Sequence, residues 1–442
     1  MPEPAQHLHA TQRHLRLGMA AVACVLALGT AYFYFALFLP HAHAARAALQ
    51  LNGHYLYGGD FHSIWLSSHE LFLHRANPYT PELSVENQIA IYGRAIGSRR
   101  SDDSIQGIYP YPLYTSFLIA PLAPLSFPAV QIVGTVLFPV LVLVSVFLWL
   151  QVLKLRLHNA TLIGLLLLIF TSYPVLEGLY AQQLTVVVSA LLAGTAAALA
   201  KEHLITAGVL LGLATVKPQL VLLLSLWLVV WAASDLSKRK AFIISLVGTV
   251  VALVIAGEII LPGWTLTWIR ALHEYRQHNH PPLAQAVLGS TLGNVSSFAL
   301  LAMTAAILWR ARRVEAASPR FAVIFALMLA VTVPIFPSSI AVYDHLLLLP
   351  AILWLFSVRA NIFSSGLPLR ILGYASVAAL FWQWIAGTVV AIASLLRPGI
   401  VSTPWVLLPV RTAASIPFAV VALCLWLWWK GATPAKSLAP SG

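Results

Sequence analysis

The chain has 442 residues, of which 60% are hydrophobic and 9% are charged, whereas soluble globular domains carry about 25% charged residues. An aqueous core cannot absorb this much apolar surface, which excludes a soluble protein and makes lipid the expected solvent. The net charge of +12 would permit nucleic-acid binding, but the basic residues lie scattered between apolar blocks, so we expect no nucleic-acid partner.

The first predicted element is an uncharged apolar run at residues 18–39, which follows a polar segment containing Arg13 and Arg16. This run is longer than the apolar core of a signal peptide, about 7–15 residues, so we expect an uncleaved first span. A polar insert at residues 41–108 follows. Eleven further apolar runs come after it, at residues 129–153, 160–176, 184–200, 204–216, 220–233, 241–261, 286–309, 321–335, 346–358, 371–396 and 405–429.

These runs predict an all-α polytopic membrane protein with about 11–13 transmembrane helices. We expect a single domain over residues 1–442, with residues 41–108 as the first outer loop and residues 262–285 as the second. Several runs are shorter than the roughly 20 residues needed to cross a bilayer. Short or broken spans are tolerated where their backbone lines a cavity inside the protein, and two of them flank Lys217-Pro218.

The loop charges predict the orientation. With the N-terminus in the cytoplasm and every run crossing, the cytoplasmic side holds most of the basic loop residues, as the positive-inside rule requires. These cations are Lys154, Arg156, Lys201, Lys238, Arg239, Lys240, Arg310, Arg312, Arg313, Arg320, Arg359, Arg370 and Lys430. The acids on the other side are Asp60, Glu70, Glu82, Glu86, Asp102, Asp103, Glu177, Glu274 and Asp344. We therefore expect a plasma-membrane protein with both termini inside and its active site on the periplasmic or extracellular face.

The segment Gly58-Gly59-Asp60-Phe61-His62 of the first outer loop is a candidate catalytic site. An acid near the membrane and among aromatic residues is partly desolvated, which raises a carboxylate's pKa toward a value useful to a general base. A solvated loop acid is the alternative interpretation. The next segment of interest, Tyr109-Pro110-Tyr111-Pro112, predicts a re-entrant or interfacial helix, or an aromatic anchor at the membrane surface.

Cations at the outer ends of spans form a third group, comprising Lys217, Arg270, Arg276 and His345. Lys217 lies between two apolar stretches, where an ionisable group is expensive and indicates function, although a lysine that extends to the interface is the alternative. His345 follows Asp344, and a structural His–Asp pair is equally compatible with that spacing.

Metal sites are not expected. The pairs His41/His43 and His278/His280 lack a third ligand at fixed spacing, and the two cysteines, Cys24 and Cys424, lie inside apolar runs. No glycine-rich nucleotide fingerprint follows a strand, so we expect no cofactor either.

Taken in order, these segments resemble the GT-C glycosyltransferase family 87, also labelled DUF2029, over about residues 20–358. The resemblance begins with the glycine–acid–aromatic segment at Asp60 and the turn Ala76-Asn77-Pro78-Tyr79. It continues through Tyr109-Pro110-Tyr111-Pro112, Ala120-Pro121-Leu122-Ala123-Pro124-Leu125, Gly178-Leu179-Tyr180-Ala181-Gln182-Gln183, Gly212-Leu213-Ala214-Thr215-Val216-Lys217-Pro218 and Tyr343-Asp344-His345. One departure is Ala181, which stands where the family's turn has glycine.

The resemblance implies a GT-C bundle with its catalytic acid, Asp60, in the first outer loop. It also implies inverting transfer of a hexose, commonly mannose, from polyprenyl phosphate to a lipid or glycan acceptor, with membrane lipids as the surroundings. The donor phosphate would then contact cations, for which Lys217, Arg270, Arg276 and His345 are the candidates. The candidate substrate contacts are Phe61, His62, Tyr109, Tyr111, Gln182, Gln183 and Asp344.

Three other classes of membrane protein compete with this hypothesis. A transporter or flippase predicts paired broken spans related by symmetry and ionisable groups at mid-bilayer. A polymerase or ligase that acts on diphosphate-linked glycans predicts a large outer loop late in the chain, whereas the large loop here is early. A non-catalytic membrane protein gives no reason for Asp60 or Lys217.

Overall fold

The computed structural model describes residues 4–96, 109–364 and 366–429. Within these ranges every regular element is a helix and no strand occurs. The predicted all-α polytopic membrane fold is therefore confirmed. Asp102 and Asp103, which were among the predicted outward acids, lie outside the described residues.

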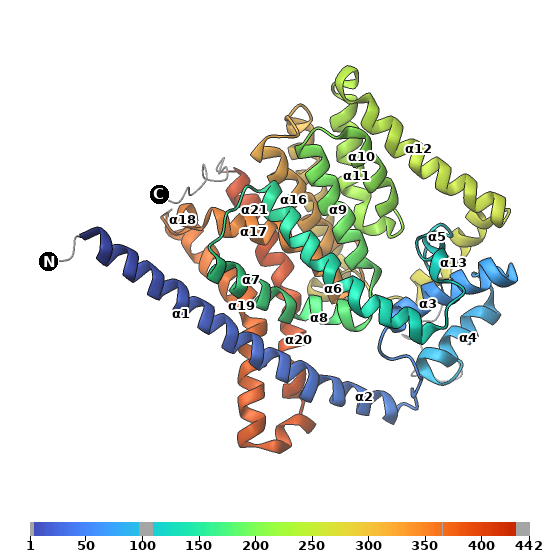
Figure 1. Ribbon diagram of the computed structural model, residues 1–442, viewed down its shortest axis with the longest axis horizontal. Helices are drawn as coiled ribbons and strands as arrows, with labels where there is room; N and C mark the ends of the chain where they lie inside the picture. Colours follow the sequence, from blue (N-terminus) through green and yellow to red (C-terminus); the bar gives the residue numbers. More distant parts are fainter. Residues whose placement is uncertain (1–3, 97–108, 365, 430–442) are drawn as a thin grey trace.

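The first part of the chain forms one long helix and a helical outer loop (Figure 1). The long helix consists of α1 (Pro4–Tyr32), a π-helical segment η1 (Phe33–Phe38) and α2 (Leu39–Ala48). The stretch predicted as the first outer loop, residues 41–108, contains α3 (Gly59–His69), the π-helical turn η2 (Glu70–His74) and α4 (Pro81–Tyr92). The short helices α5 (Thr115–Leu118) and η4 (Ala120–Leu122) follow it.

The remaining helices form the bundle and its second outer loop. They are α6 (Phe127–Val152), α7 (Asn159–Thr171), α8 (Tyr173–Tyr180), α9 (Leu184–Ala200), α10 (Leu204–Ala214), α11 (Pro218–Ala233), α12 (Leu236–Ile260), α13 (Trp264–His278), α14 (Leu283–Leu288), α15 (Ser290–Ala311), α16 (Pro319–Ile335), η5 (Val342–Leu348), α17 (Leu349–Ser357), α18 (Arg359–Phe363), α19 (Leu367–Leu396), η6 (Pro398–Ser402), η7 (Pro404–Leu407), α20 (Leu408–Thr412), η8 (Ala413–Ser415) and α21 (Ile416–Trp429).

Six helical segments are long and apolar enough to cross a membrane: Leu17–Ala48, α6, α12, α15, α19 and Pro404–Trp429. The pair α7 and α8, bent by 57°, makes a seventh if the two helices count as one span. Five shorter apolar segments, α9, α10, α11, α16 and Val342–Ser357, complete the set. Each of the twelve runs predicted from the sequence coincides with one of these segments, and the crossing of the five short ones stays a prediction.

The centre of the bundle is α16, in which every residue from 321 to 335 is buried. It packs against α11, α15, α17 and α21. Outer helices instead expose large apolar side chains, such as Ile259 on α12 at 75% and Phe298 on α15 at 75%. Contiguous apolar surface of this kind is unfavourable in water, so these faces are expected to contact lipid.

The short helix α10 approaches α12 closely through two glycines four residues apart. A Cβ atom at Gly208 would lie 2.0 Å from Ser245 Oγ, and one at Gly212 would lie 2.8 Å from Thr249 Cβ. Small residues at this spacing let two membrane helices pack backbone to backbone. This contact fixes α10, whose C-terminal end leads directly to Lys217.

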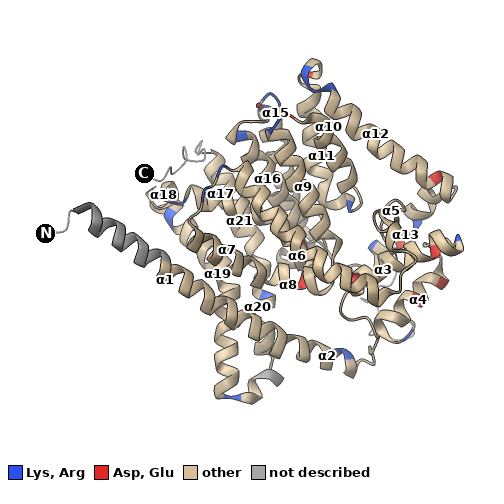
Figure 2. Cartoon of the chain, in the orientation of Figure 1, with Lys and Arg blue, Asp and Glu red and all other residues tan. Residues whose placement is uncertain are grey.

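Charged residues are distributed unevenly over the fold. Figure 2 shows Lys and Arg near the upper ends of α12 and α15 and near α18 at the left, and most Asp and Glu on the right, around α3, α4 and α13, where further Lys and Arg also lie. The helices α3, α4, α5 and α13 gather on that side (Figure 1). Acidic residues are therefore concentrated on one side of the fold, whereas basic residues occur on both sides, and the orientation stays a prediction.

Candidate active site

A glycine turn places Asp60 in the first turn of α3. Gly58 has φ +71°, in the left-handed region that favours glycine, and its N–H donates to the Tyr180 carbonyl at 2.8 Å. A Cβ atom there would lie 2.9 Å from Gln182 Oε1, so a side chain is excluded by space as well as by conformation. The turn therefore joins the start of α3 to the end of α8.

The Gln182-Gln183 turn holds the Asp60 carboxylate. Gln183 Nε2 donates to Asp60 Oδ2 at 2.7 Å. Gln182 has φ +50° and donates through Nε2 to the Gln131 carbonyl at 2.7 Å, so it fastens the turn to α6. The buried Oε1 of Gln183 has no hydrogen-bond partner among the described residues. Buried acceptors are normally satisfied, so this atom is an exception to the usual pattern.

Lys217 lies at the break between α10 and α11 and forms a buried ion pair. Its Nζ donates to Asp344 Oδ1 at 2.8 Å and to Thr185 Oγ1 at 2.6 Å, and it lies 4.8 Å from the centroid of the Tyr343 ring. Thr185 also donates to Asp344. Lys217 is only 4% exposed. Its side chain therefore ends inside the protein and does not extend to the membrane interface.

The aromatic-proline segment satisfies the carbonyl groups at this break. Tyr114 donates its hydroxyl to the Thr215 carbonyl at 3.2 Å, and Thr115 Oγ1 donates to the Val216 carbonyl at 3.3 Å. Backbone groups at the end of a helix lack intrahelical partners and are costly to bury alone. The segment therefore packs against the bundle rather than only anchoring the chain at the membrane surface, and it stabilises the backbone that carries Lys217.

The second outer loop packs onto the same segment. Trp268 of α13 donates its indole N–H to the Pro110 carbonyl at 3.0 Å, and Trp264 contacts the Tyr114 ring edge-on with centroids 5.9 Å apart. Tyr79, from the loop before α4, donates to the Tyr111 carbonyl at 2.8 Å. Both outer loops are thus connected through residues 110–114.

Asp60 combines a partly exposed side chain with closely surrounding protein. Desolvation is the largest influence and raises the pKa of its carboxyl above the ordinary value. Lys217, the hydrogen bond from Gln183 and the charge of Arg46 lower that pKa, and Asp344 raises it slightly. The net effect of these influences is a raised pKa, so the Asp60 carboxylate is a stronger base than usual. The side chain is oriented by the Gln183 amide and is partly exposed.

Tyrosines surround this carboxylate. Burial raises the pKa of Tyr111 and Tyr275 above the ordinary value, and the charges of Asp60 and Asp344 raise both further. Burial, and then the charge of Asp60, raises the pKa of Tyr92 to about 12. These tyrosines stay protonated at neutral pH and present aromatic faces with hydroxyl donors, a surface suited to a polar ring such as a sugar.

A second cation whose charge acts on Asp60, besides Lys217, is Arg46 at the end of α2, which the sequence analysis did not select. Its charge acts on Asp60, Glu177 and Tyr180, and its guanidinium lies 5.5 Å from the centroid of the Tyr92 ring. Arg46 has no salt-bridge partner within the described part of the chain. Its position is a detectable sequence signal, because an arginine directly after the outer end of a span runs against the positive-inside rule.

Contact of the two predicted cations of α13 with a donor phosphate stays a prediction. Arg270 and Arg276 are exposed, whereas Tyr275 on the same helix is half-buried and feels the charge of Asp60. The sequence analysis missed Tyr275, Tyr92 and Thr185 because none has an unusual sequence context. Their contribution depends on which face of each helix points inward.

Several other predicted residues occupy the structure around the site. Phe61 packs edge-on against Phe138 at 5.4 Å, and His62 stacks on Tyr55 and bonds Asn87 Oδ1 through Nδ1 at 2.9 Å. Tyr109 is buried and lies within 3.2 Å of Ser116 Oγ. His345 is buried on the other side of η5, and its Nδ1 has no partner among the described residues. Substrate contact by these residues stays a prediction.

Comparison with known proteins gives one match. The model of a family described as glycosyltransferase family 87 matches residues 109–338, just over half of the 442 residues. No curated protein and no solved structure matches the chain. The matched residues include Tyr111, Gln183 and Lys217, and the resemblance found in the sequence is confirmed.

The buried ion pair generates a prediction about stability. Lys217→Met or Asp344→Asn alone leaves one buried charge without its partner, which should lower the free energy of unfolding by about 3–5 kcal/mol. The double variant removes both charges and should recover most of this loss. The measurement is the melting temperature of each purified variant in the same detergent.

The control is the exposed pair Lys238–Asp235, whose atoms are 3.8 Å apart. Because exposed ion pairs contribute little, Asp235→Asn should leave the melting temperature unchanged. A Lys217→Met variant as stable as the wild type would show that the pair does not hold the helix break in place.

Proposed function

The chain belongs to glycosyltransferase family 87, and from this membership we propose that it transfers a hexose, with mannose as the first candidate, from polyprenyl phosphate to a lipid or glycan acceptor. The observation that carries the proposal is the arrangement around Asp60. Its carboxylate has a raised pKa, is held by Gln183 and lies beside the Lys217–Asp344 pair. Transfer proceeds with inversion and needs no metal.

Asp60 acts as the general base. It removes the proton from the acceptor hydroxyl while that oxygen attacks the anomeric carbon, and the bond from this carbon to the phosphate oxygen breaks. The raised pKa makes the carboxylate a stronger base, and Gln183 restrains its orientation. The unpartnered Oε1 of Gln183 can accept a hydrogen bond from a second hydroxyl of the bound sugar or acceptor.

The leaving phosphate takes the electron pair of the broken bond and gains negative charge. Cations that contact it more strongly in the transition state than in the ground state accelerate the step. Arg46 supplies a guanidinium beside Asp60 that lacks a salt bridge in the described chain. Lys217 has three N–H groups and uses two for Thr185 and Asp344, which leaves one for a phosphate oxygen.

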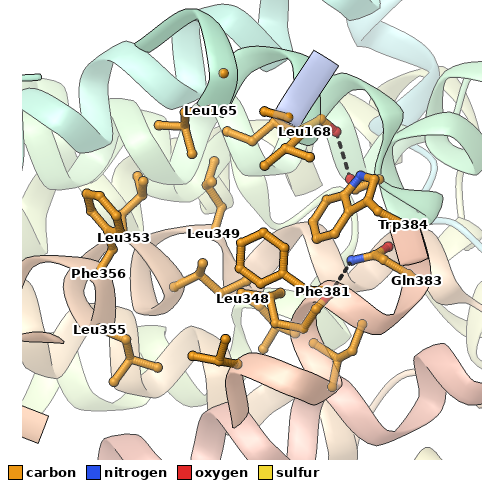
Figure 3. A pocket seen from close by; sticks show the side chains of 18 of the residues that line it. Leu165, Leu168, Leu348, Leu349, Leu353, Leu355, Phe356, Phe381, Gln383 and Trp384 are labelled. Carbon is orange, nitrogen blue, oxygen red and sulfur yellow. Dashed lines mark hydrogen bonds between the residues drawn. The ribbon is translucent and has the colours of Figure 1, made fainter. Parts of the chain in front are cut away.

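An apolar cavity supports a lipid-linked donor. It has a volume of about 800 Å³ and lies between α1, α7, α17, α19 and α21. Figure 3 shows leucine and phenylalanine side chains around the hollow, with Gln383 and Trp384 together at one end. His345 and Ser189 also line it, next to Asp344 and one helical turn from Thr185 respectively. A hydrocarbon chain in this cavity would therefore end close to the Lys217 site.

We assign the active site to the non-cytoplasmic face. Asp60 lies in the first turn of α3, on the side where most acids gather, and the basic ends of α12 and α15 lie away from that side (Figure 2). The positive-inside rule then places the basic ends in the cytoplasm.

The experiment that tests this function is sugar transfer by Asp60→Asn. Asparagine keeps the shape but cannot accept the proton, so the rate should fall by about 10²–10⁴-fold. The measurement is transfer of labelled mannose from polyprenyl phosphate, with nucleotide-linked mannose as a donor that should fail. The exposed acid Glu82 in the same loop gives the control, and Glu82→Gln should transfer normally.

The raised pKa of Asp60 also predicts a stability effect of known sign. The Asp60 carboxyl keeps its proton to a higher pH in the folded protein than in the unfolded chain. The free energy of unfolding therefore falls as pH rises from the unfolded-state pKa through the folded-state pKa of this carboxyl. Asp60→Asn should therefore be at least as stable as wild type at neutral pH, with the difference absent in acid.

In the sugar-transfer assay, a normal rate for Asp60→Asn would show that Asp60 is not the general base.

The donor-phosphate assignment predicts that Arg46→Gln lowers turnover by about 10–100-fold, since it removes a charge-assisted hydrogen bond. Arg46→Lys should retain part of the activity. The matched controls are Arg270→Gln and Arg276→Gln, which alter exposed residues of α13 and should turn over at near wild-type rates. If Arg270→Gln or Arg276→Gln lost activity while Arg46→Gln turned over normally, contact with the donor phosphate would be assigned to α13 instead.

The orientation is tested by labelling single cysteines with an impermeant thiol reagent, in a background without Cys24 and Cys424. Glu86→Cys on α4 and Glu274→Cys on α13 should be labelled from the non-cytoplasmic side, and Lys238→Cys should not. All three positions are exposed, so accessibility to solvent does not distinguish them. Outside labelling of residue 238 alone would reverse the proposed orientation.

A further inference from the structure

A group of three potential metal ligands lies at the end of α3, away from Asp60. His69, Glu70 and His74 place their ligand atoms within 4.8 Å of one another. His74 Nδ1 lies 3.0 Å from Glu70 Oε2, and the two imidazole rings have centroids 5.5 Å apart. Nine residues of helix, about 13 Å, separate His69 from Asp60, so this group is distinct from the proposed catalytic site.

The π-helical turn η2 creates the cluster. In an α-helix, residues five apart point about 140° away from each other, so His69 and His74 would face different directions. The wider turn over Glu70–His74 brings them to the same face. Such turns are rare and frequently mark functional sites. His69 and Glu70 are one residue apart and His69 and His74 are five apart, whereas ligands on one face of an α-helix are three or four residues apart. This irregular spacing is why the group was not recognised in the sequence.

The environment of His69 prepares one ring nitrogen for coordination. Its Nδ1 lies 2.7 Å from the Ala123 carbonyl, which can only accept, so Nδ1 carries the proton and Nε2 keeps its lone pair. Metal-ligating histidines typically donate their second ring nitrogen to a carbonyl or carboxylate in this way. The Trp65 ring, with its centroid 5.0 Å away, further restricts the imidazole.

We propose that His69, Glu70 and His74 bind one divalent transition-metal ion, with Zn²⁺ as the preferred ion. Two imidazole nitrogens and one carboxylate oxygen form a donor set that suits zinc, and water completes the coordination because Glu70 and His74 are accessible. The ion takes the place of the proton between His74 and Glu70, so binding releases a proton at low pH. Its role is to fasten η2 to the Ala123 turn, not to take part in sugar transfer.

The test measures metal content of the full-length protein, purified in detergent through a tag without histidine. After equilibration with zinc chloride and removal of free metal, we expect one zinc per chain by elemental analysis. His74→Ala should lose it, and because His74 is exposed this change should not unfold the protein. His69→Ala and Glu70→Gln should lose it as well. The control is His54→Ala, an exposed histidine of the same loop, which should retain the zinc.

A second measurement identifies the ligands independently of zinc retention. Cobalt(II) bound by two imidazoles and a carboxylate in a four-coordinate site gives visible absorption bands, which wild type and His54→Ala should show and His74→Ala should not. Sugar transfer by His74→Ala should stay near normal, so failure of this proposal and failure of the proposed function are distinguishable. No zinc in the wild type, or equal zinc in wild type and His74→Ala, would overturn the site.

Discussion

The buried ion pair between Lys217 and Asp344 is the interaction on which the site depends. Two charges inside a helical bundle are tolerated only when they are paired and hydrogen-bonded, and Thr185 supplies the additional bonds. Because the three residues come from the start of α9, the α10–α11 break and η5, the pair fixes three elements that are far apart in the chain. Together with Tyr114 and Thr115, it also makes an interrupted helix stable at this depth.

The outer loops complete the site by packing against that break. Residues 110–114 receive hydrogen bonds from Trp268 and Tyr79, so both loops are positioned by the same short segment. Gly58 and Gln183 then set the start of α3 and the Asp60 carboxylate against α8 and α9. The pKa of Asp60 is raised as a consequence, because desolvation of its carboxylate outweighs the stabilisation by nearby positive charges and by the hydrogen bond from Gln183. The same desolvation that makes Asp60 a stronger base also lowers the free energy of unfolding when this carboxylate is charged.

The short helix η5 separates two environments. Asp344 belongs to the charged site, and the next residue, His345, lines the apolar cavity between the spans. In the proposed reaction a sugar leaves a polyprenyl-phosphate carrier, so its donor has a polar end and a hydrocarbon end that need these two environments side by side. This adjacency supports the lipid-phosphate donor that we propose, because binding of a soluble nucleotide sugar would not use the cavity.

The fold class, the twelve apolar segments and the family could all be predicted from the amino-acid sequence, because hydropathy and short ordered motifs are local properties. The sequence also identified Asp60, Gln183, Lys217 and Asp344, since charged or amide side chains beside apolar runs are conspicuous. The pairing of Lys217 with Asp344, the partial burial of Tyr275 beside two exposed arginines, and the effect of the Arg46 charge on Asp60 emerged only in the folded chain. These outcomes depend on which face of a helix is turned inward and on a π-helical or broken turn, and both are set by packing between segments distant in the chain.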